Sequence, residues 1–215
     1  MSKWSVERWA ASTGIGFAVL LLVGSFIAGS PKKYNASAAD IQSYLQDKHK
    51  ELLIGGILFG LAYILFLWYL ASFAGFFRDA GQGRLSTIMY GAGVATITLG
   101  AIGDALGVGL AKLTYFADPN TVQALYGLQS FVYGRLYWVA AAFVLATALA
   151  TFRSKAMPDW YAWLSVLVGV LAVLGGLALK THGFFSPSGG MGFIAFIAFV
   201  VWTIISSFGL VKKTA

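Results

Sequence analysis

Two charged residues lie at the ends of long apolar runs in this chain, and they are the first candidates for chemistry. Asp104 follows one charge-free run and Arg135 precedes the next. A charge at bilayer depth costs a few kcal/mol, so such a residue is normally paired and marks a place to look for function. We predict an ion pair between them, which would serve either as a clamp between two helices or as an anchor for a ligand.

The helical rise places both charges at a similar depth. Asp104 lies 20 residues beyond Arg84, about 30 Å, and Arg135 lies 18 residues before Arg153, about 27 Å. On antiparallel neighbouring helices they would meet near one boundary of the bilayer. The middle of each run is free of charge, which argues against an ion channel or proton-coupled carrier working alone.

Other ionisable residues are expected on the same side of the membrane. Glu51, Lys180 and His182 would form the rim of an outward-facing pocket, or Lys180 would simply extend to the membrane surface. A haem in a helical bundle needs two facing axial ligands, and His49 and His182 are the only histidines. We expect no haem or metal through this pair, and no cofactor.

Enzymatic motifs are missing from the chain. It has no cysteine, which excludes disulfides and thiolate metal sites, and it contains no phosphate loop, nucleophile elbow or zinc-protease motif. We therefore expect a non-enzymatic protein. The net charge of +7 fits Lys and Arg residues that flank membrane spans and contact lipid headgroups, so we predict membrane lipids as partners and no nucleic acid.

The elements that must position these residues are membrane spans. The 215 residues are 59% hydrophobic and 11% charged, whereas a soluble domain carries about a quarter charged residues. A bilayer core of about 30 Å needs roughly 20 helical residues. We predict an all-α, six-transmembrane-helix bundle forming a single domain, 1–215, with a retained first span. The expected spans are about 9–31, 52–77, 85–110, 131–152, 160–180 and 190–211.

Local signals add detail outside and between the spans. Ser37 and Asp40 form a capping box that predicts a short outer amphipathic helix, about 38–50. Asp118 is the expected N-cap of a helix that projects outward or breaks near Gly127 or Gly134. Small residues let helices approach closely in lipid, and the pairs expected to do so, either within the bundle or through self-association, are Gly56 with Gly60 and Gly103 with Gly107.

The orientation follows from the positions of Lys and Arg. Eight of these residues fall on the side of both termini and six on the opposite side, of which four lie in one longer loop. Cytoplasmic loops carry an excess of positive charge. We expect both termini in the cytoplasm and the chain in a plasma membrane.

Several short segments are similar to an uncharacterised family of six-span bacterial membrane proteins. They comprise Leu67-Trp68-Tyr69-Leu70, the turn 79–84, Asp118-Pro119-Asn120, Met157-Pro158-Asp159-Trp160 and the basic tail. The resemblance implies a six-helix bundle in a bacterial plasma membrane and no established activity, so it transfers no functional residues.

Two functions remain open. The first is a structural or accessory subunit of a membrane complex, with other membrane subunits or a second copy as partners. The second is a binder or carrier of a lipid, pigment, quinone or other small hydrophobic ligand, whose polar group would contact the layer of Asp104 and Arg135.

Overall fold

A computed structural model describes residues 6–33, 35–180, 183–187 and 189–213. Within these ranges the chain forms seven α-helices and no strand, and six of the helices are long and apolar enough to cross a membrane. The predicted all-α, six-span fold class is therefore confirmed. The helices are α1 (Val6–Ala28), α2 (Ala38–Asp47), α3 (His49–Asp79), α4 (Gly83–Leu113), α5 (Pro119–Ser154), α6 (Asp159–Gly176) and α7 (Gly190–Lys213).

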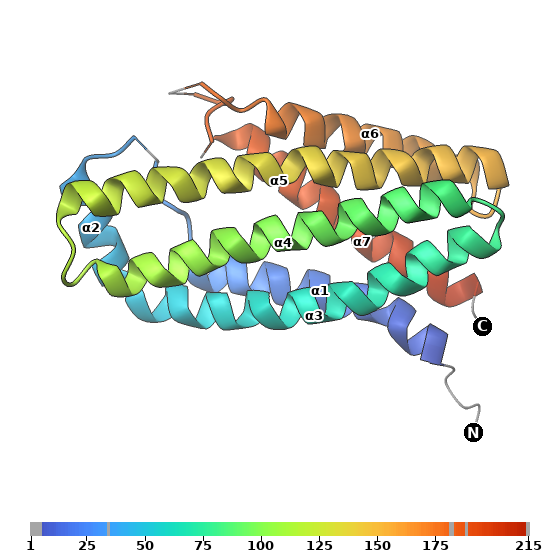
Figure 1. The fold of residues 1–215 in the computed structure, drawn as a ribbon, viewed down its shortest axis with the longest axis horizontal. Helices are drawn as coiled ribbons and strands as arrows, with labels where there is room; N and C mark the ends of the chain where they lie inside the picture. The colour runs from blue at the N-terminus through green and yellow to red at the C-terminus, as the bar shows by residue number, and fades with distance from the viewer. Residues whose placement is uncertain (1–5, 34, 181–182, 188, 214–215) are drawn as a thin grey trace.

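The six spans form a closed ring of neighbours. α1 contacts α3, α3 contacts α4, α4 contacts α5, α5 contacts α6 and α6 contacts α7; α7 contacts α1 and closes the ring. The start of α1 and the end of α7 lie at one end of the bundle, and α2 lies at the other (Figure 1). We call these the terminal end and the α2 end.

Aromatic side chains fill the centre of this ring. Phe66 and Phe73 of α3, Phe143 of α5 and Trp202 of α7 have no exposed surface. The ring of Phe143 lies edge-on to that of Trp202, with centroids 5.3 Å apart. Trp202 Nε1 donates a hydrogen bond to Ser165 Oγ at 2.8 Å, so its polar atom is satisfied inside the core.

The helices differ in length, and this difference creates a projection at the α2 end. α6 has 18 residues, about 27 Å, close to the thickness of the hydrocarbon core. α5 has 36 residues, about 54 Å. It is continuous, so it projects beyond the membrane core and does not break at Gly127 or Gly134. α3 and α4 each have 31 residues and extend in the same direction (Figure 1).

α2 covers these projecting ends. Its buried face carries Ile41 and Leu45, which pack with Leu110 of α4 and with Val122 and Tyr126 of α5. We call α2 and the projecting ends of α3, α4 and α5 the cap.

Hydrogen bonds fix α2 in the cap. Gln42 Nε2 and Gln46 Nε2 both donate to the carbonyl oxygen of Thr114, at 3.0 and 3.2 Å. Ser37 caps the helix by accepting from the Asp40 amide at 3.1 Å. The short helix ends at Asp47, before the predicted limit of 50, and α3 begins separately at His49.

Candidate functional site

Asp104 of α4 is held by two tyrosines from two neighbouring helices. Tyr63 of α3 donates a hydrogen bond to Oδ2, and Tyr133 of α5 donates one to Oδ1. All three side chains are partly buried. One carboxylate therefore joins three consecutive spans at the base of the cap.

Two glycines on α4 make room for the two tyrosine rings. A Cβ atom added at Gly100 would lie 2.8 Å from Tyr63 Oη, and one added at Gly103 would lie 2.6 Å from Tyr133 Cε1. Contacts this short do not occur with a real side chain, so each ring occupies the space that a glycine leaves. The rings can approach Asp104 because the face of α4 beside it carries no side chains at these positions.

A third polar side chain from α5 completes the contact with α4. Gln129 Nε2 donates to the carbonyl oxygen of Gly103 at 3.0 Å, and it lies where a Cβ of Gly107 would be, 2.5 Å away. Gly56 of α3 similarly faces Val108, with 2.5 Å to a virtual Cβ. Of the four glycines expected in helix packing, Gly56, Gly103 and Gly107 meet a neighbouring helix, whereas Gly60 is exposed and has no atom within 4 Å of a virtual Cβ.

The arrangement satisfies both oxygens of the carboxyl group. Each carboxylate oxygen accepts one O–H donor, and a hydrogen bond to a charged group contributes about 1.5–3 kcal/mol. Because the donors are neutral phenols, the site needs no second desolvated charge, and desolvating two charges often costs more than their attraction returns. The chemistry of the site is therefore that of a clamp between α3, α4 and α5.

The predicted ion pair between Asp104 and Arg135 is not formed. The ion pairs within the described residues are Lys48 with Glu51 and Lys155 with Asp159. The physical reason is the direction of the side chain around α5. Tyr133 faces α4, and Arg135 lies two residues further on, about 200° around the helix, where it is exposed.

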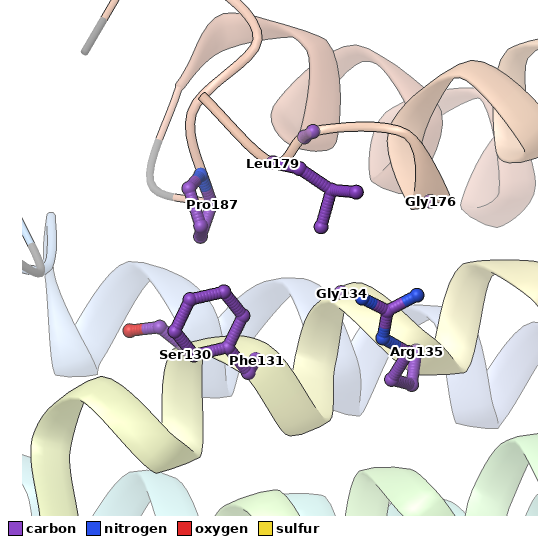
Figure 2. Close-up of a pocket in the computed structure, with 8 residues that line it drawn as sticks. Ser130, Phe131, Gly134, Arg135, Gly176, Leu179 and Pro187 are labelled. Carbon is purple, nitrogen blue, oxygen red and sulfur yellow. The ribbon is translucent and has the colours of Figure 1, made fainter. Parts of the chain in front are cut away.

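Arg135 instead borders a shallow recess between α5 and the segment that joins α6 to α7. The recess is lined by Ser130, Phe131, Gly134, Arg135, Gly176, Ala178, Leu179 and Pro187. Figure 2 shows the guanidinium of Arg135 extending from α5 toward that segment, with Leu179 and Pro187 on the opposite side. Depth along the helix was a sound guide to the level of the two charges, but they face different neighbours.

The predicted rim residues do not gather around Asp104. Glu51 contacts Lys48, with 3.3 Å between Oε1 and Nζ, and it lies 12 residues before Tyr63 on α3, about 18 Å along the axis. Lys180 is exposed in the segment after α6. His182 lies outside the described residues.

His49 belongs to the cap. Its Nδ1 atom lies 2.7 Å from the carbonyl oxygen of Ala111, and its ring lies edge-on to that of Tyr115, 5.3 Å between centroids. The contact joins the start of α3 to the end of α4. Across the described part of the chain, no three His, Asp or Glu residues gather in a way that could hold a metal ion.

Tyr44 and Asp118, at the α2 end of the molecule, have perturbed pKa values. Burial raises the pKa of Tyr44, and the negative charge of Glu51 adds to this effect. The pKa of Asp118 is lowered, first by the hydrogen bond from the Thr121 hydroxyl and then by the amides of Thr121 and Asn120. Asp118 is thus the N-cap of α5, as its position before Pro119 predicted.

Tyr63, Tyr133 and Gln129 are the site residues that sequence reasoning missed. The same depth count that placed Asp104 could have found Tyr63, which lies 16 residues before Asp79, about 24 Å from the terminal end. A second signal was the pair Gly100 and Gly103 beside Asp104, since a glycine next to a buried charge leaves space for a partner's ring.

Fold and site define a polytopic, all-helical membrane protein with a tyrosine-clamped carboxylate at the base of an extramembrane cap. Comparison with protein-family models, with curated proteins and with solved structures finds no match to this chain. The functional argument therefore depends on the chain's own residues.

Proposed function

We propose that the protein is a non-enzymatic structural or accessory subunit of a membrane complex, with membrane lipids and other membrane subunits, or a second copy, as its partners. The observation that carries this proposal is the filled centre of the helix ring. Phe66, Phe73, Phe143 and Trp202 occupy it without exposed surface. A transporter of polar solutes keeps polar groups or broken helices at this depth.

The Asp104 site supports the same proposal. Both oxygens of the carboxylate are occupied by tyrosine hydroxyls, so the charge serves contacts within the chain. Its position at the base of the cap means that the clamp fixes how α4 and α5 project from the membrane. A fixed projection is what a subunit needs in order to present one surface to a partner.

The tip of the cap is the best surface for such a partner. Tyr115 and Phe116 are 56% and 76% exposed, and they lie in the turn between α4 and α5, the part of the cap furthest from the terminal end (Figure 1). Aromatic residues exposed outside the hydrocarbon core are enriched at protein interfaces.

A photo-crosslinking amino acid placed at Phe116 tests this proposal. The expected result is a single adduct of defined mass and fixed stoichiometry in the native membrane. The same amino acid at Phe66, which is fully buried, provides the control and should give only bonds within the chain. A purified monomer that crosslinks at Phe116 to lipid or to nothing would contradict the subunit function.

For the location, we propose a bacterial plasma membrane with the terminal end in the cytoplasm. The helix ends and turns at that end carry Arg78, Arg84, Arg153 and Lys155, as cytoplasmic segments do. Because the chain has no cysteine, single cysteines report the orientation directly. Ser43→Cys on α2 should react with an impermeant thiol reagent in intact cells, and Asp79→Cys only after lysis; the reverse pattern would invert the topology.

A further inference from the structure

Arg135 carries a full positive charge on the surface of α5. Its side chain is exposed, and within the described residues no ion pair includes it. A guanidinium stays protonated in proteins and presents planar N–H donors that match phosphate oxygens in pairs. The guanidinium of Arg135 can therefore bind an anion, and no carboxylate of the described residues is paired with it.

The depth of Arg135 is that of lipid headgroups. Trp138 Nε1 donates to the carbonyl oxygen of Gly176 at 3.2 Å, which joins α5 to the last residue of α6. Because α6 is only 18 residues long, about 27 Å, its end marks the edge of the hydrocarbon core. Arg135 lies three residues further toward the α2 end, about 4.5 Å beyond this edge.

Exposed apolar side chains lie near Arg135, both along α5 and across the recess. Phe131 and Trp138 on α5 are 41% and 40% exposed, and Leu179 beyond α6 is 52% exposed. Leu179 lies across the recess from Phe131 and Arg135 (Figure 2). Trp138 lies on the membrane side of Arg135, whereas Phe131 lies four residues toward the α2 end, about 6 Å further out. A cation at headgroup depth with an aromatic side chain on its membrane side matches a phospholipid, which carries its phosphate directly above its acyl chains.

We propose that Arg135 binds the phosphate of an anionic phospholipid in the leaflet at the α2 end. The lipid lies over the recess between α5 and the segment after α6, with its phosphate on the guanidinium, its headgroup beside Phe131 and Leu179, and the upper part of its chains against Trp138. This role goes beyond that of a structural subunit, and it holds whether or not a protein partner binds the cap.

Lipid binding to the purified full chain tests the proposal. Native mass spectrometry would compare phosphatidylglycerol with phosphatidylcholine for the wild type, Arg135→Gln and Arg135→Lys. The control is Arg153→Gln, which removes another exposed arginine from the terminal end of the same helix. A surface cation contributes about 1 kcal/mol to binding of anionic lipid, which corresponds to about fivefold in affinity.

The expected result is that Arg135→Gln weakens phosphatidylglycerol binding by more than the about fivefold of a general surface cation, that Arg135→Lys gives an intermediate loss, and that Arg153→Gln loses no more than about fivefold. Equal losses in Arg135→Gln and Arg153→Gln would show diffuse attraction and overturn the proposal. Equal binding of phosphatidylcholine by the wild type would also overturn it. Inorganic phosphate that displaces the lipid completely would assign the site to a free ion and would likewise overturn it.

Discussion

The substitution Gly103→Ala would place a methyl group against the ring that closes the Asp104 site. A Cβ at position 103 would lie 2.6 Å from Cε1, 2.9 Å from Cζ and 3.0 Å from Cδ1 of Tyr133. The ring is rigid, and its hydroxyl group is bound to Asp104. Either α4 and α5 move apart, or Tyr133 leaves the carboxylate.

The size of the effect follows from these two outcomes. An extra methyl group in a packed interface costs about 1–3 kcal/mol, and losing a hydrogen bond to a charged group costs about 1.5–3 kcal/mol. Alanine recovers about 1 kcal/mol through its higher helix propensity. Gly91→Ala on the same helix isolates that last contribution, because nothing lies within 4 Å of its virtual Cβ. Since one outcome or the other occurs, we expect Gly103→Ala to be about 1–3 kcal/mol less stable than Gly91→Ala.

Reversible unfolding in mixed detergent micelles, followed by circular dichroism, would measure this difference. A second background sharpens the assignment: in Tyr133→Ala the ring is gone, so adding Gly103→Ala should cost no more than Gly91→Ala does. Equal stability of Gly103→Ala and Gly91→Ala in the wild-type background would refute the proposed fit between Gly103 and Tyr133. A penalty that persists without the ring would show that Gly103 has another role.

Asp104→Asn and Arg135→Gln should change the free energy of unfolding additively, within about 0.5 kcal/mol. A larger coupling energy in a double-mutant cycle would show that the two residues do form an ion pair. Leu45→Ala should lower the stability of the cap by about 2–5 kcal/mol and expose α2 to limited proteolysis while the spans stay folded. If the cap and the spans unfold together, the cap is not a separate cooperative unit. Hydrogen bonds from Thr121 and from backbone amides lower the pKa of Asp118 below its ordinary value of 3.8, so its stabilisation is complete above that value and is lost as the pH falls below it. The difference in thermal midpoint between the wild type and Asp118→Ala should therefore shrink on acidification from about pH 5 to about pH 3, and a constant difference would contradict the capping role.

Features set by local physics could be predicted from the sequence. Bilayer thickness fixes the length of a span, so uncharged runs predicted six spanning helices. The N-caps at Ser37 and Asp118 were predicted from residue type, because a cap satisfies amides only two or three residues away. The outward projection of α5 also followed from its length, once the structure excluded a break at Gly127 or Gly134.

Features that depend on the rotation of a helix about its own axis could not be predicted. Counting residues gives depth at 1.5 Å per residue, but each residue also turns the side chain by about 100°. The depth count therefore placed Asp104 and Arg135 at one level without showing that they face different helices. Identifying Tyr63 and Tyr133 as the partners of Asp104 requires knowing which faces of α3 and α5 meet α4, and that depends on packing between distant residues.

The separation of the two charges has a physical advantage. An arginine facing Asp104 inside the bundle would need its remaining N–H donors satisfied as well, in a region where the rings of Tyr63 and Tyr133 occupy the space beside Gly100 and Gly103. Tyr63 and Tyr133 satisfy both carboxylate oxygens with one donor each and bury only apolar ring surface besides. Tyrosine is thus the partner that lets α3, α4 and α5 pack closely, while Arg135 is exposed on α5, where we propose that it binds lipid.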